Sequence, residues 1–148
     1  MSSTAKNFMS DNAFIDTNVV VYALGGNKQS VPEARIEQAQ QIMIQGGVVS
    51  VQVMNEFVQV CRRAGLAWSE ILDKLQTIED LCSRVLPLTL ETHRSAVALS
   101  KRYGFHIYDA SILAVAQEAN CTIVYSEDMQ HGQKIGALKI VNPFLSPT

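Results

Sequence analysis

The stretch NAFIDTNVVVYAL, from Asn12 to Leu24, decides how the rest of the chain is interpreted. A short apolar run ends at Asp16, two polar residues follow, and mostly apolar residues then continue to Leu24. We predict a buried strand over 13–17 and a helix over about 18–24. An ionised carboxylate in such an apolar run is costly unless something pairs with it. The question is therefore what Asp16 faces.

The composition is that of an ordinary globular protein. The chain has 148 residues, of which 47% are hydrophobic, so it can bury a single core and is not expected to be disordered. The formal net charge of −2 shows no overall basic character of a nucleic-acid binder. This counts only weakly against such a partner, because a cluster of acidic metal ligands would hide local basic patches in the sum.

Cysteine spacing and the absence of long apolar runs indicate in which cellular compartment the protein is expected. Cys61, Cys82 and Cys121 are widely spaced and odd in number, so we expect three reduced, buried thiols and no disulfide framework. The first residues lack an apolar signal core, and no run is long enough to span a bilayer. We therefore expect a cytoplasmic protein with no membrane contact, in which residues 1–11 form a flexible tail.

Helical patterns alternate with short, continuously apolar segments along the rest of the chain. The predicted helices cover 33–45, 52–64, 68–82, about 90–103 and 108–120, and the further predicted strands cover 48–51, 84–88, 122–126 and 138–142. Pro87 favours an edge or strand-end position for its strand. This alternation predicts one α/β domain over 12–148, with a mainly parallel sheet of about five strands and helices on both faces.

The segment 68–82 has the clearest amphipathic helical pattern. Its apolar residues recur at helical spacing, with acidic and basic residues on the opposite side. The predicted apolar stripe consists of Trp68, Ile71, Leu72, Leu75, Ile78 and Cys82.

Acidic residues follow the predicted strands or open the next helices. They are Asp16, Glu56, Asp109 and Asp128. Each has an ordinary explanation by itself: Asp16 as a helix N-cap, Asp109 as a charge complementing a helix dipole, and Asp128 as a turn residue. For Glu56, a solvated position at the edge of a helix is the ordinary explanation.

Taken together, these acids predict a cation site. Ligands bind outside the carboxyl ends of strands in open α/β sheets, where these residues are expected to meet. Two carboxylates about 4 Å apart repel by roughly 4 kcal/mol at an effective dielectric near 20, so a divalent cation is needed among them. An all-oxygen ligand set with no nearby Cys or His favours Mg²⁺ or Mn²⁺ over zinc.

Four segments carry a resemblance to a known family. They are FIDTNVVVYAL, VSVQVMNEF, YDASILAVA and IVYSEDM, and in order and spacing they resemble the motifs of PIN-domain nucleases, most closely the small VapC-like toxins of bacterial toxin–antitoxin pairs. The resemblance extends from Asn12 to Pro143. It implies a PIN-like three-layer α/β/α fold and a Mg²⁺- or Mn²⁺-dependent endoribonuclease that cleaves RNA.

The resemblance also implies roles for individual residues. Asp16, Glu56, Asp109 and Asp128 would be the catalytic, metal-binding acids. Asn18, Thr17 and Ser126 would support them by hydrogen bonds. Glu127 lies beside Asp128 and could substitute for it or share its role. The implied partners are an RNA substrate, a cognate antitoxin whose tail covers the acidic site, and a second copy of the chain in a homodimer.

Other titratable and basic residues receive smaller roles. A metal-dependent mechanism needs no histidine, so His93, His106 and His131 are expected to be structural or solvated. Small basic pairs could contact RNA phosphates, although solvated helix ends explain any single pair equally well. These pairs are Arg62 with Arg63, Lys101 with Arg102, and Lys134 with Lys139. No aromatic residues are interleaved with them to suggest a stacking platform.

Two other protein classes also have acidic residues near strand ends. A haloacid-dehalogenase-type phosphatase needs a second Asp where this chain has Asn18, and a receiver-type domain needs an acidic pair near the first strand and a Lys after the last. Neither requirement is met. The remaining alternative is a PIN-like module that binds RNA or protein without cleaving, against which the presence of all four acids argues.

Overall fold

The computed structural model describes residues 12–26 and 30–145, so the tail expected over 1–11 lies outside the described residues. The described residues form six helices and six strands. In chain order the elements are β1 (Ala13–Ile15), α2 (Thr17–Leu24), α3 (Glu33–Gln45), β2 (Val48–Ser50), α4 (Val51–Arg63), α5 (Trp68–Leu81), β3 (Arg84–Leu86), α6 (Leu90–Tyr103), α7 (Ile107–Glu118), β4 (Ile123–Tyr125), β5 (Lys134–Ile135) and β6 (Leu138–Val141).

The strands form one mainly parallel sheet in the order β3-β2-β1-β4-β6-β5. Phe14 at the centre of β1 pairs in parallel register with Val48 on one side and Val124 on the other. Only the pair β5–β6 is antiparallel. Because β1, β2 and β4 run in the same direction, the residues that follow these strands meet at one edge of the sheet.

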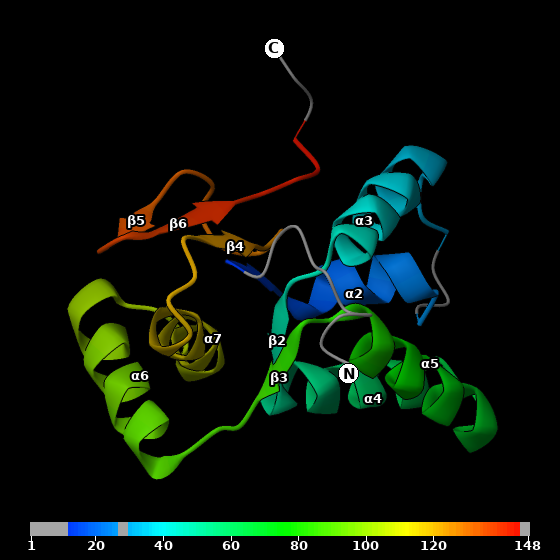
Figure 1. Cartoon of the computed structure of the whole chain (residues 1–148), viewed down its shortest axis with the longest axis horizontal. Coiled ribbons are helices and arrows are strands. Elements are labelled where there is room, and N and C mark those ends of the chain that lie inside the picture. Colours follow the sequence, from blue (N-terminus) through cyan, green and yellow to red (C-terminus); the bar gives the residue numbers. More distant parts are fainter. Residues whose placement is uncertain (1–11, 27–29, 146–148) are drawn as a thin grey trace, which may run out of the picture.

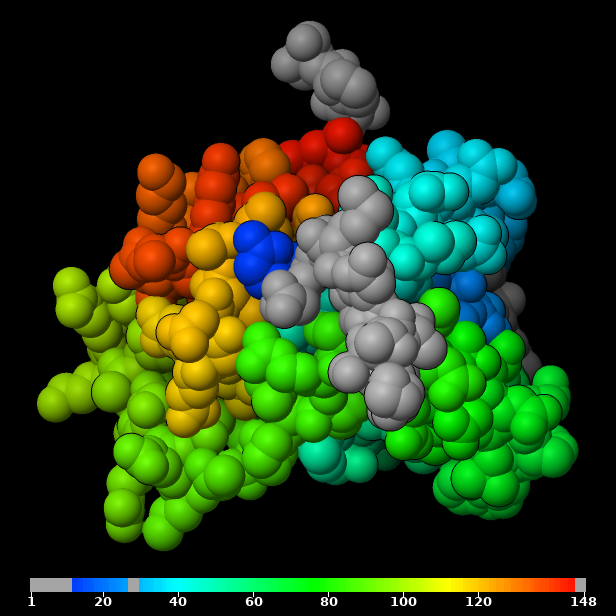
Figure 2. All heavy atoms as spheres, in the orientation of Figure 1, coloured from blue at the N-terminus to red at the C-terminus, as the bar shows by residue number. Residues whose placement is uncertain are grey.

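Helices cover both faces of this sheet, as the alternating pattern predicted. Figure 1 shows the strands between α6 and α7 on one side and α2 to α5 on the other. The space-filling view in Figure 2 shows α3 and α5 on one side of the molecule and the β5–β6 pair at the opposite corner. The sheet is therefore enclosed between two helical layers.

Continuous burial explains the apolar character of the central strands. Every residue of β1 and of β2 is buried. Gly47, directly before β2, is needed for the close approach of these strands: a Cβ at this position would lie 2.8 Å from Ile15 Cδ1 and 3.0 Å from the Ala13 carbonyl oxygen. Any side chain there would force β1 and β2 apart.

The predicted elements agree with the observed ones, and the differences have a local cause. The helices over 33–45 and 90–103 have the predicted bounds. The first two strands are shorter than predicted because Asp16 and Ser50 cap the helices that follow, each accepting a hydrogen bond from a backbone N–H of the first turn. β3 lies at an edge of the sheet, which agrees with Pro87 directly after it.

Two details of the fold were not predicted from the sequence. The sheet has a sixth strand, β5, whose two residues are too few to produce a periodic pattern. The apolar stripe predicted over 68–82 is buried only in part, at Ile71, Ile78 and Cys82. Trp68 and Leu72 are 53% and 61% exposed, because they lie on one side of the stripe, whereas the fully buried Ile71 lies on the other side, which faces the core. In the described part of the chain, no helix is both long and apolar enough to cross a bilayer.

Candidate functional site

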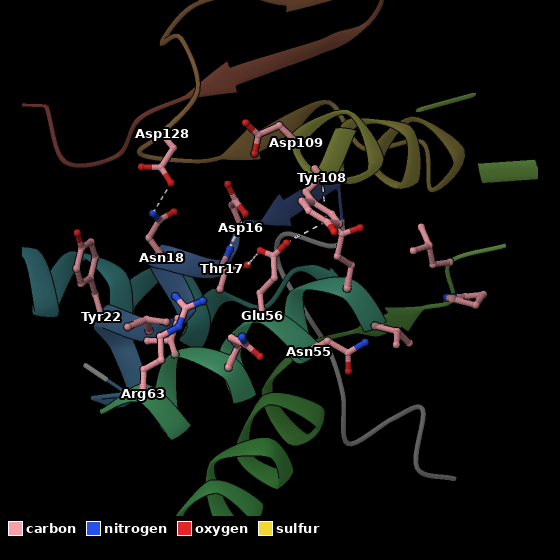
Figure 3. Close-up of a pocket in the computed structure, with 17 residues that line it drawn as sticks. Asp16, Thr17, Asn18, Tyr22, Asn55, Glu56, Arg63, Tyr108, Asp109 and Asp128 are labelled. Atoms are coloured by element: carbon pink, nitrogen blue, oxygen red, sulfur yellow. Dashed lines mark hydrogen bonds between the residues drawn. The ribbon is translucent and has the colours of Figure 1, made fainter. Parts of the chain in front are cut away.

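A cavity of about 1150 Å³ opens at the carboxyl ends of β1, β2 and β4. Its wall comes from α2, α4, the start of α7 and the loops after β3 and β4, as the close-up in Figure 3 shows for the labelled side chains. All four acids predicted from the sequence line this cavity: Asp16, Glu56, Asp109 and Asp128. The sheet therefore brings together carboxylates that are up to 112 positions apart in the chain.

Asp16 is the most buried of these acids, with 4% of its surface exposed. Its Oδ1 accepts a hydrogen bond of 2.7 Å from the Thr17 backbone N–H, and its Oδ2 accepts one of 2.7 Å from the Ser126 hydroxyl. Burial raises the pKa of Asp16 from 3.8 to about 7; these two hydrogen bonds oppose the shift, and the charges of Asp109 and Glu56 add to it. Asp16 is therefore both a helix N-cap and a member of the acidic site.

Two further supporting residues each hold one of the other acids. The Thr17 hydroxyl donates a hydrogen bond of 2.7 Å to Glu56 Oε1, and Asn18 Nδ2 donates one of 2.8 Å to Asp128 Oδ2 (Figure 3). Thr17 and Asn18 are the first two residues of α2. The Asp-Thr-Asn segment thus contributes one acid and fixes two others through its neighbouring side chains.

Asp109 stands in the first turn of α7 and is half-buried. Among the described residues, no hydrogen bond to its carboxylate is seen. Burial raises the pKa of Asp109, the neighbouring charge of Asp128 raises it further, and His106 lowers it. The Asp109 carboxylate is therefore not held as a helix cap and is exposed to the repulsion of the other acids.

Glu127 has different partners from Asp128. It forms an ion pair with Arg35 and accepts a hydrogen bond from the Tyr22 hydroxyl. The Arg35 guanidinium also packs over the rings of Tyr22 and Phe144, at 5.5 Å and 5.2 Å from their centres. Glu127 is therefore committed to a contact between α2, α3 and the C-terminal segment and is absent from the cavity wall, whereas Asp128 lines it.

One residue of the site was not identified from the sequence. Gln52, in the first turn of α4, is buried, and its Nε2 donates to Glu56 Oε2 at 3.0 Å and to the Tyr108 carbonyl oxygen at 2.9 Å. It links the helix that carries Glu56 to the one that carries Asp109. The available signal was its position one helical turn before Glu56, which places both side chains on the same face of α4.

The basic pairs separate into different environments. Arg63 lines the cavity. Arg62 instead donates to the Leu66 carbonyl oxygen and packs over the ring of Trp68, 4.6 Å from its centre. Lys134 and Lys139 face each other across the β5–β6 pair, away from the cavity wall. Only one of the predicted basic residues, Arg63, thus lines the cavity that contains the acids.

The cysteines and one histidine behave as expected. Cys61, Cys82 and Cys121 are buried and form no disulfide. His131 Nδ1 accepts a hydrogen bond from the backbone N–H of Asn142, which is a structural role.

The donor set fits a hard divalent cation. It consists of carboxylate oxygens, and Asn18 Oδ1 adds a buried oxygen with no hydrogen-bond partner. As the side chains stand, no group of three or more His, Cys, Asp or Glu residues within 12–26 and 30–145 is arranged to hold a metal ion. A bound cation therefore requires these side chains to turn further toward one another than they do here.

Comparisons with known proteins agree with this arrangement. A family model described as "PIN domain" matches residues 13–134. No curated protein matches the chain in sequence.

Solved structures of similar fold come from several bacteria. The VapC20 toxin of Mycobacterium tuberculosis, described as cleaving the sarcin–ricin loop, is 21% identical, with a TM-score of 0.60 over 78% of this chain and 89% of that one. FitAcB from Neisseria gonorrhoeae is 18% identical, with a TM-score of 0.62 over 89% and 98% of the two chains. VapBC2 from Rickettsia felis, bound to a DNA fragment from its promoter, is 16% identical, with a TM-score of 0.60 over 86% and 96%. At these identities the likeness shows a shared fold.

Proposed function

This chain belongs to the PIN domain family, and from that premise we propose that it is a Mg²⁺- or Mn²⁺-dependent endoribonuclease acting as the toxin of a toxin–antitoxin pair. One observation carries the proposal. Four carboxylates from four separate segments line one cavity, and three of them are each fixed by a hydrogen bond from a different polar side chain. Such positioning of like charges lowers stability without a cation, and so favours a functional explanation.

The acids and their supporting residues have different roles in this proposal. Asp16 and Asp109 are the central ligands in this proposal, and Glu56 and Asp128 complete the ligand set or orient the attacking water. A bound divalent ion supplies charge neutralisation at the scissile phosphate and activation of water. Ser126 holds Asp16 in place, and the first residues of α2 hold Glu56 and Asp128.

The surroundings of the acids suit an RNA strand. Arg63 is the cation on the cavity wall, and it is exposed, so its guanidinium can meet a backbone phosphate next to the scissile one. The cavity is also large enough for more than one nucleotide, since pockets for small ligands enclose roughly 300–1000 Å³.

Partners follow from the same proposal. A basic antitoxin segment complements an acidic cavity electrostatically and would block access to it. The Rickettsia felis relative is a complex bound to promoter DNA, which supports an antitoxin partner for this chain. We also propose a cytoplasmic homodimer.

A binding module without nuclease activity is the alternative. It would retain the fold and contact RNA or protein without cleaving. The hydrogen bonds to the acids argue against it, because a chain that needs no cation has no reason to keep Asp16, Glu56 and Asp128 oriented toward one cavity.

The purified protein, free of any antitoxin, is expected to cleave RNA only with a divalent cation. Mixed cellular RNA would be incubated with it in millimolar Mg²⁺ or Mn²⁺, and in parallel in EDTA, and the fragments would be separated on denaturing gels. Cleavage in both metals that stops in EDTA supports the proposal. Cleavage that persists in EDTA, or none with any RNA offered, contradicts it.

Glu127 and Asp128 are expected to respond differently to loss of charge. Asp128→Asn should lower the cleavage rate about 100-fold, because Asp128 lines the cavity, whereas Glu127→Gln should stay within about threefold of the parent rate. The effect of Glu127→Gln should fall on thermal stability instead, since it weakens the contact with Arg35. Cleavage rates and melting temperatures of both variants test this. A cleavage defect in Glu127→Gln as large as that in Asp128→Asn would assign the fourth acid to Glu127.

A further inference from the structure

Two exposed aromatic rings, His106 and Tyr108, stand at the start of α7 next to Asp109; Tyr108 lines the cavity, and His106 is not part of its wall. Tyr108 precedes Asp109 in the first turn of α7 and is 60% exposed, although it lines the same cavity as the four carboxylates. The ring of His106, the N-cap of α7, lies beside it, with 5.2 Å between ring centres and 32° between their planes. Figure 3 shows Tyr108 next to Asp109 among the cavity side chains. Because single exposed aromatic residues are common on protein surfaces, it is the position of these two rings beside Asp109, and not their exposure alone, that indicates a role.

The backbone that carries both rings is tied to the site by hydrogen bonds. Gln52 donates to the Tyr108 carbonyl oxygen and, through the same Nε2, to Glu56. The Tyr108 backbone N–H donates to His106 Nδ1 at 3.3 Å, which leaves His106 Nε2 as the ring nitrogen directed away from the helix. The backbone at Tyr108 is therefore linked to Glu56 through Gln52, and the His106 ring is linked to the first turn of α7.

We infer that His106 and Tyr108 form a stacking platform for one unpaired nucleobase of the RNA substrate, adjacent to the phosphate that is cleaved. The inference rests on the proposed function and adds a subsite to it. Every nucleobase has a flat π-face that stacks on an aromatic ring, and single-stranded RNA is recognised largely in this way. Neither ring is needed to hold a cation or to cap the buried core, so stacking accounts for their exposure.

The remaining wall of the cavity suits the rest of such a nucleotide strand. Asn55 and Gln59 line the cavity from α4 and are exposed, so their amides can hydrogen-bond base edges. Arg63 lies one helical turn beyond Gln59 on the same helix and can meet a phosphate. If one base stacks beside the acids and a phosphate contacts Arg63 further along α4, the RNA strand runs along α4 through the cavity.

The test measures coupling between one base and one ring. Single-stranded RNA oligonucleotides of mixed sequence would carry an abasic nucleotide at each position in turn, and binding would be followed by fluorescence anisotropy in EDTA. All variants would be made in an Asp109→Asn background, which retains both rings and removes one repelling charge, and gels would show that the RNA stays intact. Tyr108→Phe keeps the stacking face, Tyr108→Ala removes it, and Trp68→Ala removes an exposed ring outside the cavity wall.

We expect one position of the RNA at which loss of the base weakens binding about tenfold in the background chain, in Tyr108→Phe and in Trp68→Ala. In Tyr108→Ala the same loss should weaken binding much less, because only the His106 ring remains for the base to stack on. A 5-iodouridine at that position should crosslink to Tyr108 or His106 on irradiation.

Other results overturn the inference in distinguishable ways. If abasic substitutions weaken binding equally with and without the Tyr108 ring, the platform does not exist, while metal-dependent cleavage by the parent still stands. If Tyr108→Ala leaves RNA binding unchanged but weakens binding of an antitoxin peptide, the rings serve a protein partner. If the parent protein neither binds nor cleaves RNA, the proposed function fails and the inference fails with it.

Discussion

Asp16→Asn is expected to slow RNA cleavage about a thousandfold or more while the protein stays folded, a loss of about 4 kcal/mol of transition-state stabilisation. The amide has the shape of the carboxylate and can keep its contacts. Its oxygen can accept from the Thr17 N–H, and its NH₂ can donate to Ser126 Oγ, so the N-cap survives. What is lost is the negative charge at the most buried point of the cavity.

Cleavage rates with Mg²⁺, and growth of the host after induction, measure this effect. Asp73→Asn is the matched control, because it makes the same change at an exposed position on α5, outside the cavity wall. It should behave like the parent in both assays. Induction of the parent should arrest growth, and Asp16→Asn should relieve the arrest at equal protein level. Arrest that persists in a folded Asp16→Asn variant would mean that the protein is toxic by binding and not by cleavage.

The meeting of the four acids could be predicted because parallel sheets obey a simple rule. Residues that follow β1, β2 and β4 must lie at one edge of the sheet. Asp16 follows β1 directly, Asp128 lies in the loop after β4, and Glu56 and Asp109 stand near the starts of helices. The strand positions, known to within two residues, were enough to place Asp16, Glu56 and Asp128 at one edge; Asp109 joins them because α7 leads into β4 and therefore begins near the carboxyl end of that strand.

Details that depend on side-chain partners could not be predicted in this way. Glu127 and Asp128 are neighbours in an irregular loop, and only the folded chain shows Arg35 and Tyr22 beside Glu127. Gln52 bridges two helices whose relative position depends on the whole sheet. Periodicity within one segment contains no information about such long-range contacts.

The exposure of two aromatic rings is a further feature that sequence periodicity could not predict. The sequence pattern placed Trp68 in an apolar stripe and attached no aromatic residue to a binding surface. In the fold Trp68 is exposed, and so is Tyr108, whose ring stands beside the acids. Helical spacing defines the face on which a residue lies, but the extent of the core decides whether that face is covered.

Asp16→Asn is also expected to raise the stability of the metal-free protein at neutral and higher pH. Burial raises the pKa of Asp16 from 3.8 to about 7, so the folded chain keeps this proton over a pH range in which the unfolded chain has released it. The folded state then binds more protons, and the stability of the parent falls as pH rises from about 4 to about 7. A shift of this size corresponds to about 4 kcal/mol, of which relaxation of the site should leave roughly 2 kcal/mol observable.

Thermal melts of the parent and Asp16→Asn in EDTA, between pH 4 and pH 8, measure the difference. The two proteins should melt together near pH 4 and separate progressively, with the variant melting roughly 4–8 °C higher at pH 8. Asp109→Asn should shift in the same direction by less, because Asp109 is only half-buried. Millimolar Mg²⁺ should reverse the order: at 100 times its dissociation constant, an ion binding only the folded state adds about 2.7 kcal/mol to the parent and much less to either variant. If Asp16→Asn melts well below the parent in EDTA at pH 8, the Asp16 carboxylate is chiefly a structural hydrogen-bond acceptor, and its assignment as a metal ligand fails.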